Sequence, residues 1–402
     1  MKFSITNNFR FMCTASKKMN QLLQNRYESA EVKLKELVSR ARQLTVCLDE
    51  WTKKSLTASF LGISCCFYDR VDSITRHIVL SIKQIQHPHT GEMLKDAVTE
   101  VLSEWNIDST KVLMLVTDNG ANVVKAMRLL SEEATVAAAA ATSSADEMGD
   151  LEDEQAESRE DEETSDEDLG DDPDDHCEDD ELDFPHIAFR HMPCMAHSLQ
   201  LVVKKAFRST HCIIVSKVRT LVAHIRRSGV AVQMLLNLSG KNVIMDNATR
   251  WNSSFQMMKR LSELRTSVNQ VTQAMKIDSL RVAEWDELVS LVELLEPFAE
   301  QTNVLQSDAQ SLSYIIPSLL NLQYHLQNFN GYKTLSQSML QDLNARFKHI
   351  LEPAAVNHSF NPIPASACLL DPSVARAMFT EDVHELLEAA KSYTITQVCL
   401  QQ

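Results

Sequence analysis

Glycine is scarce in this sequence, and so is proline. Only 8 of the 402 residues are Gly and 10 are Pro, which excludes collagen-like and low-complexity chains. The glycine content lies well under the average of about 7% and suits long helices better than a turn-rich β-sandwich. With 44% apolar and 6% aromatic residues, the chain is long enough to bury a core and to form two or three domains. We expect helix to dominate.

Paired cysteines and long apolar runs are also missing. The nine Cys are odd in number and lack the spacing of a disulfide framework, which indicates thiols in a reducing compartment. No stretch approaches the ~20 apolar residues that span a membrane, and the first 20 residues lack the apolar core of a signal peptide. The sequence therefore predicts a cytosolic or nuclear protein.

The net charge of −16 is concentrated in one segment. Residues 146–183 hold 23 Asp and Glu against one basic residue, and the rest of the chain carries about +6. A block of like charge with few large apolar residues predicts disorder. A solvated linker is its simplest interpretation; a mimic of a polyanion, competing with DNA for basic surfaces, is the sharper hypothesis.

Apolar periodicity predicts a mixed domain followed by helices. An amphipathic helix is expected over 29–42, then three strands in a meander, a helix after Pro88, a buried strand and a second helix. The strands are expected at 44–48, 60–68, 78–85 and 112–116, with a fifth at 187–192. Further helices are expected at 121–130, from about 196, and at 211–227, 255–275, 282–306, 314–327, 335–351 and 381–390.

Two aspartates carry the chemistry in this pattern. Asp49 and Asp118 each follow a predicted strand, and side chains at strand carboxyl ends gather in the crevice of an α/β sheet. With a third carboxylate, such a pair holds divalent ions that activate the attacking oxygen and stabilise the leaving oxygen of a phosphodiester. Hard oxygens favour Mg²⁺ or Mn²⁺ over zinc. The spacing alone fits turn or N-cap residues equally well.

Five segments in order resemble the conserved blocks of the hAT (hobo, Activator, Tam3) transposases. These segments are most similar to the zinc finger BED domain-containing proteins that derive from the hAT transposases. The segment FLGISCCFYD is also similar to that group. The segments are CLDEWT (47–52), VTDNGANVVKAMRLL (116–130), MPCMAHSLQLVVKKAF (192–207), TRWNSSFQMMKRL (249–261) and CLLDP (368–372).

The resemblance implies an RNase H-like catalytic fold, of α+β or α/β class, which an acidic disordered insert interrupts and a mainly α-helical insertion domain follows. It implies that Asp49 and Asp118 are the first two members of a metal-binding Asp-Asp-Glu triad. Cys194 and His197 match a C-x-x-H motif whose His contacts DNA. Arg250 and Trp251 match a pair in which Trp stacks on a flipped base, a contact that recovers unstacking energy.

The chain also departs from the family pattern. No residues before 29 have zinc-finger spacing; Ser373, Val374 and Ala375 replace the usual basic pair; and the chain stops at Gln402. In the expected final helix, Glu381, Glu385 and Glu388 match no motif of the triad's Glu. We therefore expect the third carboxylate to be missing and the two Asp to be vestigial.

Other clusters favour structural interpretations. A structural zinc site needs four ligands, and His191, Cys194 and His197 lack a second pair, so no zinc is expected; a turn is expected at 87–89. The first helices after the insert carry several basic residues, which have two possible interpretations. They could line a DNA-facing surface, or they could form an ordinary solvated helix face. These are Lys204, Lys205, Arg208, Lys217, Arg219, Arg226 and Arg227.

The predicted domain order follows from these segments. We expect an N-terminal tail (1–28), the first part of the RNase H-like domain (29–145), the acidic insert (146–183), the last strand (184–197), the helical insertion domain (198–365) and a truncated C-terminal return segment (366–402).

The leading hypothesis is a domesticated, catalytically inactive hAT transposase-like nuclear protein that associates with DNA or regulates transcription. One alternative is an active, metal-dependent DNA transposase of which this chain is a fragment. Another is a protein-interaction scaffold that does not bind DNA. We expect DNA and other nuclear proteins as partners, no membrane, no oligomer without the family's C-terminal region, and Mg²⁺ or Mn²⁺ if the aspartate site is intact.

Overall fold

The computed structural model divides the chain into two compact units, one built on a sheet and one built of helices. It describes residues 16–53, 58–85, 89–118, 120–130, 191–208, 213–247, 251–306, 312–353 and 360–399. The acidic insert and Arg250 lie outside these ranges, so their expected roles stay predictions.

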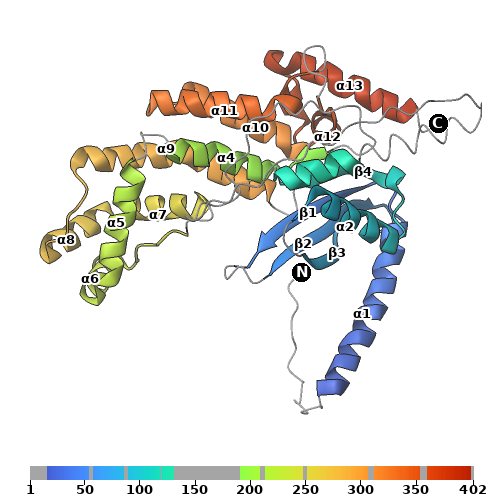
Figure 1. Ribbon diagram of the computed structural model, residues 1–402. Coiled ribbons are helices and arrows are strands. Elements are labelled where there is room, and N and C mark those ends of the chain that lie inside the picture. Colours follow the sequence, from blue (N-terminus) through green and yellow to red (C-terminus); the bar gives the residue numbers. More distant parts are fainter. Residues whose placement is uncertain are drawn as a thin grey trace, which may run out of the picture. The chain divides into compact units, whose positions relative to one another are not determined.

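Among the described residues, the sheet of the first unit has five strands in the order β3-β2-β1-β4-β5. Figure 1 labels β1, β2, β3 and β4. β1 pairs antiparallel with β2 and parallel with β4, and β2 pairs antiparallel with β3. The predicted meander and the parallel strand after it are confirmed. The strands are β1 (Leu44–Thr52), β2 (Ser59–Asp69), β3 (Ile74–Ile85), β4 (Val112–Thr117) and β5 (His191–Pro193).

Alternation along β1 gives the sheet a buried face. Leu44, Val46 and Leu48 are 2%, 0% and 6% exposed and belong to one core with α2 (Gly91–Glu104) and residues 121–130. Each such side chain contributes about 1.5–3 kcal/mol on burial. Thr90 begins α2, accepting a hydrogen bond from the Met93 N–H.

The first helix is longer than the sequence pattern suggested. α1 spans Ser16–Ser39, so part of the expected N-terminal tail is helical, and the prediction of a start at residue 29 was wrong. Its last turns join the core through Val38, with Leu34 and Leu37 packed against it. Every described side chain from Lys18 to Ala30 is exposed, which explains why the apolar pattern there was too weak to predict a helix.

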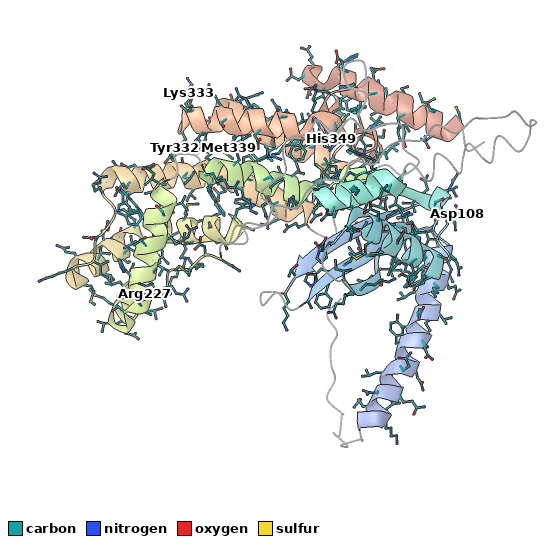
Figure 2. All side chains as sticks on the ribbon, viewed as in Figure 1. Asp108, Arg227, Tyr332, Lys333, Met339 and His349 are labelled. Atoms are coloured by element: carbon teal, nitrogen blue, oxygen red, sulfur yellow. The ribbon has the colours of Figure 1, made fainter. Side chains whose placement is uncertain are left out.

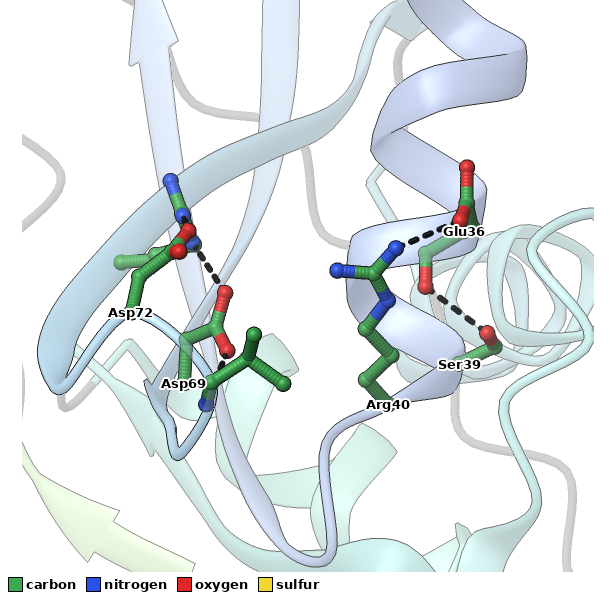
Figure 3. A network of polar contacts seen from close by, with 7 residues as sticks. Glu36, Ser39, Arg40, Asp69 and Asp72 are labelled. Carbon is green, nitrogen blue, oxygen red and sulfur yellow. Dashed lines mark hydrogen bonds and ion pairs between the residues drawn. The ribbon is translucent and has the colours of Figure 1, made fainter.

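A polar network closes the hairpin between β2 and β3 (Figure 3). Asp69 is 2% exposed and accepts hydrogen bonds from Arg76 Nε at 2.7 Å and from the Val71 N–H at 3.0 Å. Arg76 also pairs with Asp72. The hydrogen bond from Arg76 holds the pKa of Asp69 below its usual value. The network fixes the register of the two strands, because it joins both ends of the turn.

The second unit is helical, as predicted, and it differs in four places, one of which is α12 (Ile363–Leu370), a helix that the sequence pattern did not predict. An unexpected helix, α6, lies between Ser228, whose hydroxyl accepts from the Ala231 N–H, and Gly240, at φ 67°. The expected helix 255–275 breaks at Leu264, where neither Gly nor Pro marks the break. The helices are α4 (Met195–Arg208), α5 (Ile213–Arg227), α6 (Gly229–Ser239), α7 (Trp251–Glu263), α8 (Arg265–Met275), α9 (Val282–Leu305), α10 (Ile315–Asn328), α11 (Lys333–Leu351), α12 (Ile363–Leu370) and α13 (His384–Cys399).

The fourth difference concerns the chain's last segment. α12 and α13 belong to the helical unit, whereas the resemblance placed 366–402 as a segment returning to the sheet domain. Ser366 Oγ donates to the Ala390 carbonyl at 3.2 Å, and Leu386 and Ala390 are buried. Asp371 of the CLLDP segment caps the turn after α12, accepting from the Ser373 N–H at 3.0 Å and from Ser313 Oγ at 2.6 Å. These contacts account for the placement.

No helix among the described residues is both long enough and apolar enough to cross a bilayer.

Candidate functional site

Asp49 lies inside β1, which runs on to Thr52, so the prediction that it follows the strand was wrong; Asp118 directly follows β4, the parallel neighbour of β1. Cys47 pairs with Val116, and each aspartate lies two residues further along its own chain. Neighbouring strands run about 4.8 Å apart, and a shift of two residues returns a side chain to the same face. The register thus brings the two predicted site residues side by side. Asp49 is exposed and Asp118 is half-buried.

Asp49 lies on what we term the outer face of the sheet, formed by Cys47, Asp49 and Trp51 of β1 with Gly62 and Cys66 of β2. Its cross-strand partner is Gly62, which has no side chain to cover the carboxylate. Trp51 and Phe60 stack with ring centroids 5.7 Å apart, and a Cβ on Gly62 would lie 2.9 Å from Trp51 Cζ3. The indole therefore occupies the space above Gly62, beside Asp49.

A hydrogen bond between Thr117, the last residue of β4, and His191 of the neighbouring strand β5 holds the end of β4 in place. The sequence analysis assigned neither residue to the aspartate site. Thr117 Oγ1 lies 2.7 Å from the Asp118 carbonyl oxygen and 2.7 Å from His191 Nε2. A hydroxyl has one proton, so it donates to the carbonyl and accepts from an Nε2–H imidazole. Thr117 and His191 are separated by 74 residues in sequence, and only the β4–β5 pairing brings them together. They hold the main-chain carbonyl of Asp118.

The next carboxylate in the sequence points elsewhere. Glu50 pairs with Nδ1 of His89, the residue before the Thr90 cap of α2. Glu50 is therefore engaged in fixing the sheet to its covering helix. Of the turn expected at 87–89, only His89 lies within the described residues.

Two neighbouring carboxylates fit a hard divalent cation. Mg²⁺ is commonly held by one or two carboxylates, with waters or phosphate oxygens completing its octahedron, and Mn²⁺ has the same ligand preference. A bound ion would supply a Lewis acid for a phosphate oxygen. Gly120 leaves room here, because even a Cβ would lie 3.5 Å from Asp118 Oδ1. Within the described ranges no three His, Cys, Asp or Glu side chains cluster as metal ligands.

The three glutamates considered for the triad lie in the helical unit. Glu381 is in the short 3₁₀ turn Glu381–Val383, and Glu385 and Glu388 are in α13. Glu388 pairs with Lys391 at 2.7 Å, which lowers the pKa of Glu388.

The C-x-x-H motif sits at a helix start. Cys194 directly precedes α4, and its carbonyl accepts from the Ser198 N–H at 2.9 Å. His197 is in the first turn, so the two motif residues share a helix face. Both are half-buried. The motif's sequence spacing thus reflects a helix N-terminus.

Trp251 is enclosed. The side chain is 4% exposed, at the start of α7, with its ring centroid 6.2 Å from that of Phe255. The preceding loop is anchored by Asp246, which accepts from Arg219 Nη2 at 2.6 Å and Ser254 Oγ at 2.8 Å. Burial raises the pKa of Asp246, but the Arg219 and Ser254 hydrogen bonds outweigh it and hold the pKa below its usual value. Stacking on a base would require the Trp251 ring to be uncovered.

Several of the basic residues considered for DNA contact are paired with acids inside the helical unit. Lys205 meets Asp342 at 2.8 Å, Arg219 meets Asp246, and Lys217 meets Glu284. The two arginines at the end of α5, Arg226 and Arg227, are exposed (Arg227 is labelled in Figure 2). The exposed pair at the helix end is the better candidate for a phosphate contact.

Comparison with known proteins agrees with this architecture. Residues 47–144 match the ZBED1 RNase-like domain and residues 192–294 match the ZBED1 RNase-like helical domain. Together these two matches cover half of the chain, with the sheet unit first and the helical unit second.

Individual relatives are more distant. The chain is 25% identical over 343 residues to the proposed transcriptional regulator tpeD of Talaromyces stipitatus, covering 77% of this chain and 34% of that protein. It is 24% identical over 205 residues to human zinc finger BED domain-containing protein 4, covering 48% and 17%, and 28% identical over 148 residues to mouse zinc finger BED domain-containing protein 6, covering 35% and 15%. The chain thus spans about a third or less of the length of these relatives.

A sheet unit that matches an RNase-like domain, followed by a unit that matches its helical domain, defines a transposase-derived class of protein. The chain belongs to the hAT transposase-derived proteins of the zinc finger BED type.

Proposed function

We propose that the protein is a domesticated, transposase-derived nuclear regulator that associates with DNA and does not cut it. Its similarity to tpeD, named as a proposed transcriptional regulator, and to two zinc finger BED domain-containing proteins supports a regulatory role in the nucleus. The enclosed Trp251 is the observation that favours DNA binding without cleavage. Its ring packs beside Phe255 and supports α7, so it does not receive an extruded base.

On this proposal the aspartate pair survives as a metal-binding remnant. Asp49 and Asp118 would share one Mg²⁺ or Mn²⁺ ion, and Thr117 and His191 would hold Asp118 in place for it. In a two-metal displacement, one ion stabilises the attacking oxygen and the other stabilises the leaving oxygen. Two carboxylates provide too few ligands to hold both ions. Metal binding without strand cleavage is the expected behaviour.

The test combines a binding assay with a cleavage assay on the full chain. We expect retention on duplex DNA at low salt that weakens steeply as salt rises, since phosphate contacts release counterions. With Mg²⁺ or Mn²⁺ present, we expect supercoiled plasmid to stay intact. Metal-dependent nicking that Asp49→Ala abolishes would overturn the proposal.

An active DNA transposase, of which this chain is a fragment, is the second candidate. The shared register of Asp49 and Asp118 favours it, because that arrangement is what a nuclease site on this sheet requires. The nicking assay decides between the two candidates. Absence of any retention on DNA at low salt would contradict both of them and would favour the protein-interaction scaffold.

A further inference from the structure

Two adjacent cysteines on β2 face opposite sides of the sheet. Cys65 points into the core and is 1% exposed, whereas Cys66 is half-buried on the outer face. Neither is in a disulfide. The pair offers the same chemical group in two environments, one residue apart.

Cys66 has an imidazole beside it. His77 is its partner in the antiparallel register of β2 and β3, and Cys66 Sγ lies 3.7 Å from His77 Nε2. The histidine is exposed. A thiol within hydrogen-bonding reach of an imidazole is the arrangement that generates a thiolate nucleophile.

Cys65 is inert by comparison. Burial, followed by the neighbouring Cys66 and Cys47 thiols, raises the pKa of Cys65 to about 12. The thiolate is the reactive species, so almost none is present at Cys65 near neutral pH. The core face also denies a reagent access to its sulfur.

We propose that Cys66 is a modification site, at which the thiol exchanges with a low-molecular-weight disulfide and His77 acts as its base. His77 takes the thiol proton, and the Cys66 thiolate attacks one sulfur of the small disulfide. A new S–S bond forms to Cys66 while the old S–S bond breaks. The departing thiolate takes the proton from the imidazolium and leaves as a thiol. Cys66 is oxidised to a mixed disulfide, and half of the reagent is reduced.

The geometry of β1 and β2 preserves such an adduct. Among the described cysteines, the other thiol on the outer face is that of Cys47, which pairs with Ser64, while Cys66 pairs with Thr45. Cys47 and Cys66 are therefore diagonal neighbours, whose Cα atoms lie about 7–8 Å apart. A disulfide needs roughly 4.4–6.8 Å, so Cys47 does not displace the adduct without backbone movement.

The site shares its face with Asp49. Gly62, the partner of Asp49, precedes Cys66 by four residues of β2, about 13 Å along the strand. Beside Cys47 and His77, Tyr68 is the other titratable side chain of the strands on this part of the face. An adduct the size of a peptide covers surface between Cys66 and the aspartate pair, so oxidation would alter access to the latter.

The experiment uses the fully reduced full-length chain and oxidised glutathione at pH 7. The rate of mixed-disulfide formation is measured at each cysteine by acid quenching and peptide mass spectrometry. Cys399 of α13, which is exposed, reports an ordinary surface thiol, and Cys65 reports a buried one. We expect Cys66 to react at least about ten times faster than Cys65, and faster than Cys399 despite its lower exposure.

Two variants on the outer face of β3 distinguish the effect of the His77 base from the effect of a change in access to Cys66. His77→Gln retains a polar side chain without a base, and we expect it to slow Cys66 by at least about three-fold while Cys399 is unchanged. Val79→Gln, on the same face and 59% exposed, is the matched control and leaves the Cys66 rate unchanged. Circular dichroism verifies the fold of each variant.

A Cys66 rate no greater than that of Cys399, or a rate unaffected by His77→Gln in a folded chain, would overturn the proposal. If His77→Gln does not fold, the comparison of Cys66 with Cys399 in the unaltered chain decides. Neither readout depends on metal or DNA binding, so the outcome is independent of the proposed function.

Discussion

Asp49 and Asp118 each lie two residues beyond Cys47 and Val116, which pair across the parallel strands β1 and β4. One register therefore sets the two residues at matching positions along the chain, Asp49 inside β1 and Asp118 just past β4. No local feature of either strand does this, since the two aspartates belong to segments almost 70 residues apart.

The first prediction concerns metal binding by this pair. Asp49→Asn and Asp118→Asn should each weaken Mn²⁺ binding to the full chain by at least about ten-fold, because each removes one of two anionic ligands. Titration calorimetry measures the affinity. Asp96→Asn is the control, since that carboxylate on α2 has a side chain 74% exposed. Equal binding by all three variants would remove the aspartate pair as the site.

Thr117 and His191 should matter to the same site indirectly. His191→Gln keeps a hydrogen-bond donor near Thr117, whereas His191→Ala removes the side chain that donates to the Thr117 hydroxyl across the β4–β5 pairing. We expect the alanine variant to weaken Mn²⁺ binding several-fold and the glutamine variant to restore most of the loss. Identical behaviour of the two variants would show that His191 does not position Asp118.

Trp251 and Trp51 offer a paired test of burial. Trp251 is 4% exposed and Trp51 is 40% exposed. Trp251→Ala should lower the free energy of unfolding by about 3–5 kcal/mol. Trp51→Ala should cost only about 1 kcal/mol, mainly from the lost stacking on Phe60. Urea denaturation measures both. A stable Trp251→Ala chain with weakened DNA binding would instead favour the base-stacking role.

Arginines of α5 should divide into structural and DNA-facing residues. Arg226→Ala and Arg227→Ala should each reduce DNA affinity and lower the slope of log affinity against log salt by about one, without loss of stability. Arg219→Ala should instead destabilise the chain, because it leaves Asp246, whose side chain is 4% exposed, without its bidentate partner. Salt-dependent fluorescence anisotropy, with thermal melting alongside, distinguishes the two groups. Unchanged affinity in both end-of-helix variants would exclude them as phosphate contacts.

Acid should destabilise the helical unit through His349 of α11 (Figure 2). Burial lowers the pKa of this imidazole to about 4, and its Nε2 is buried without a hydrogen-bond partner among the described residues. Between pH 6.5 and 4 the unfolded chain binds a proton that the folded chain does not. Stability present above pH 6.5 is therefore lost as the pH falls, by about 2–3 kcal/mol.

Urea denaturation as a function of pH checks this prediction. His349→Gln, which cannot titrate, should flatten the dependence by that amount, whereas the exposed His224→Gln should leave it unchanged. Parallel curves for the two variants would exclude His349 as the source.

The local sequence pattern was sufficient to predict a helix or strand where the environment of each residue depends on its near neighbours in sequence. Short apolar, β-prone runs predicted β1 to β4, and helical periodicity predicted most of the second unit. It failed for the first half of α1, whose side chains from Lys18 to Ala30 are all exposed, and at Leu264, where the apolar pattern runs through the break. The signal for α6 was present in Ser228 and Gly240, which cap it at either end.

Short contiguous segments were enough to predict the class of fold, the resemblance to the hAT transposases and the choice of Asp49 and Asp118 as candidate site residues, because each of these is encoded locally. Only the tertiary structure decided that Trp251 is enclosed, that Lys217 and Arg219 are neutralised by acids, that His191 meets Thr117 and that Cys66 meets His77. Each of these contacts joins residues that are distant in sequence and that strand pairing or helix packing brings together. The burial of a side chain and the pairing of its charge depend on those distant neighbours, so local sequence does not predict them.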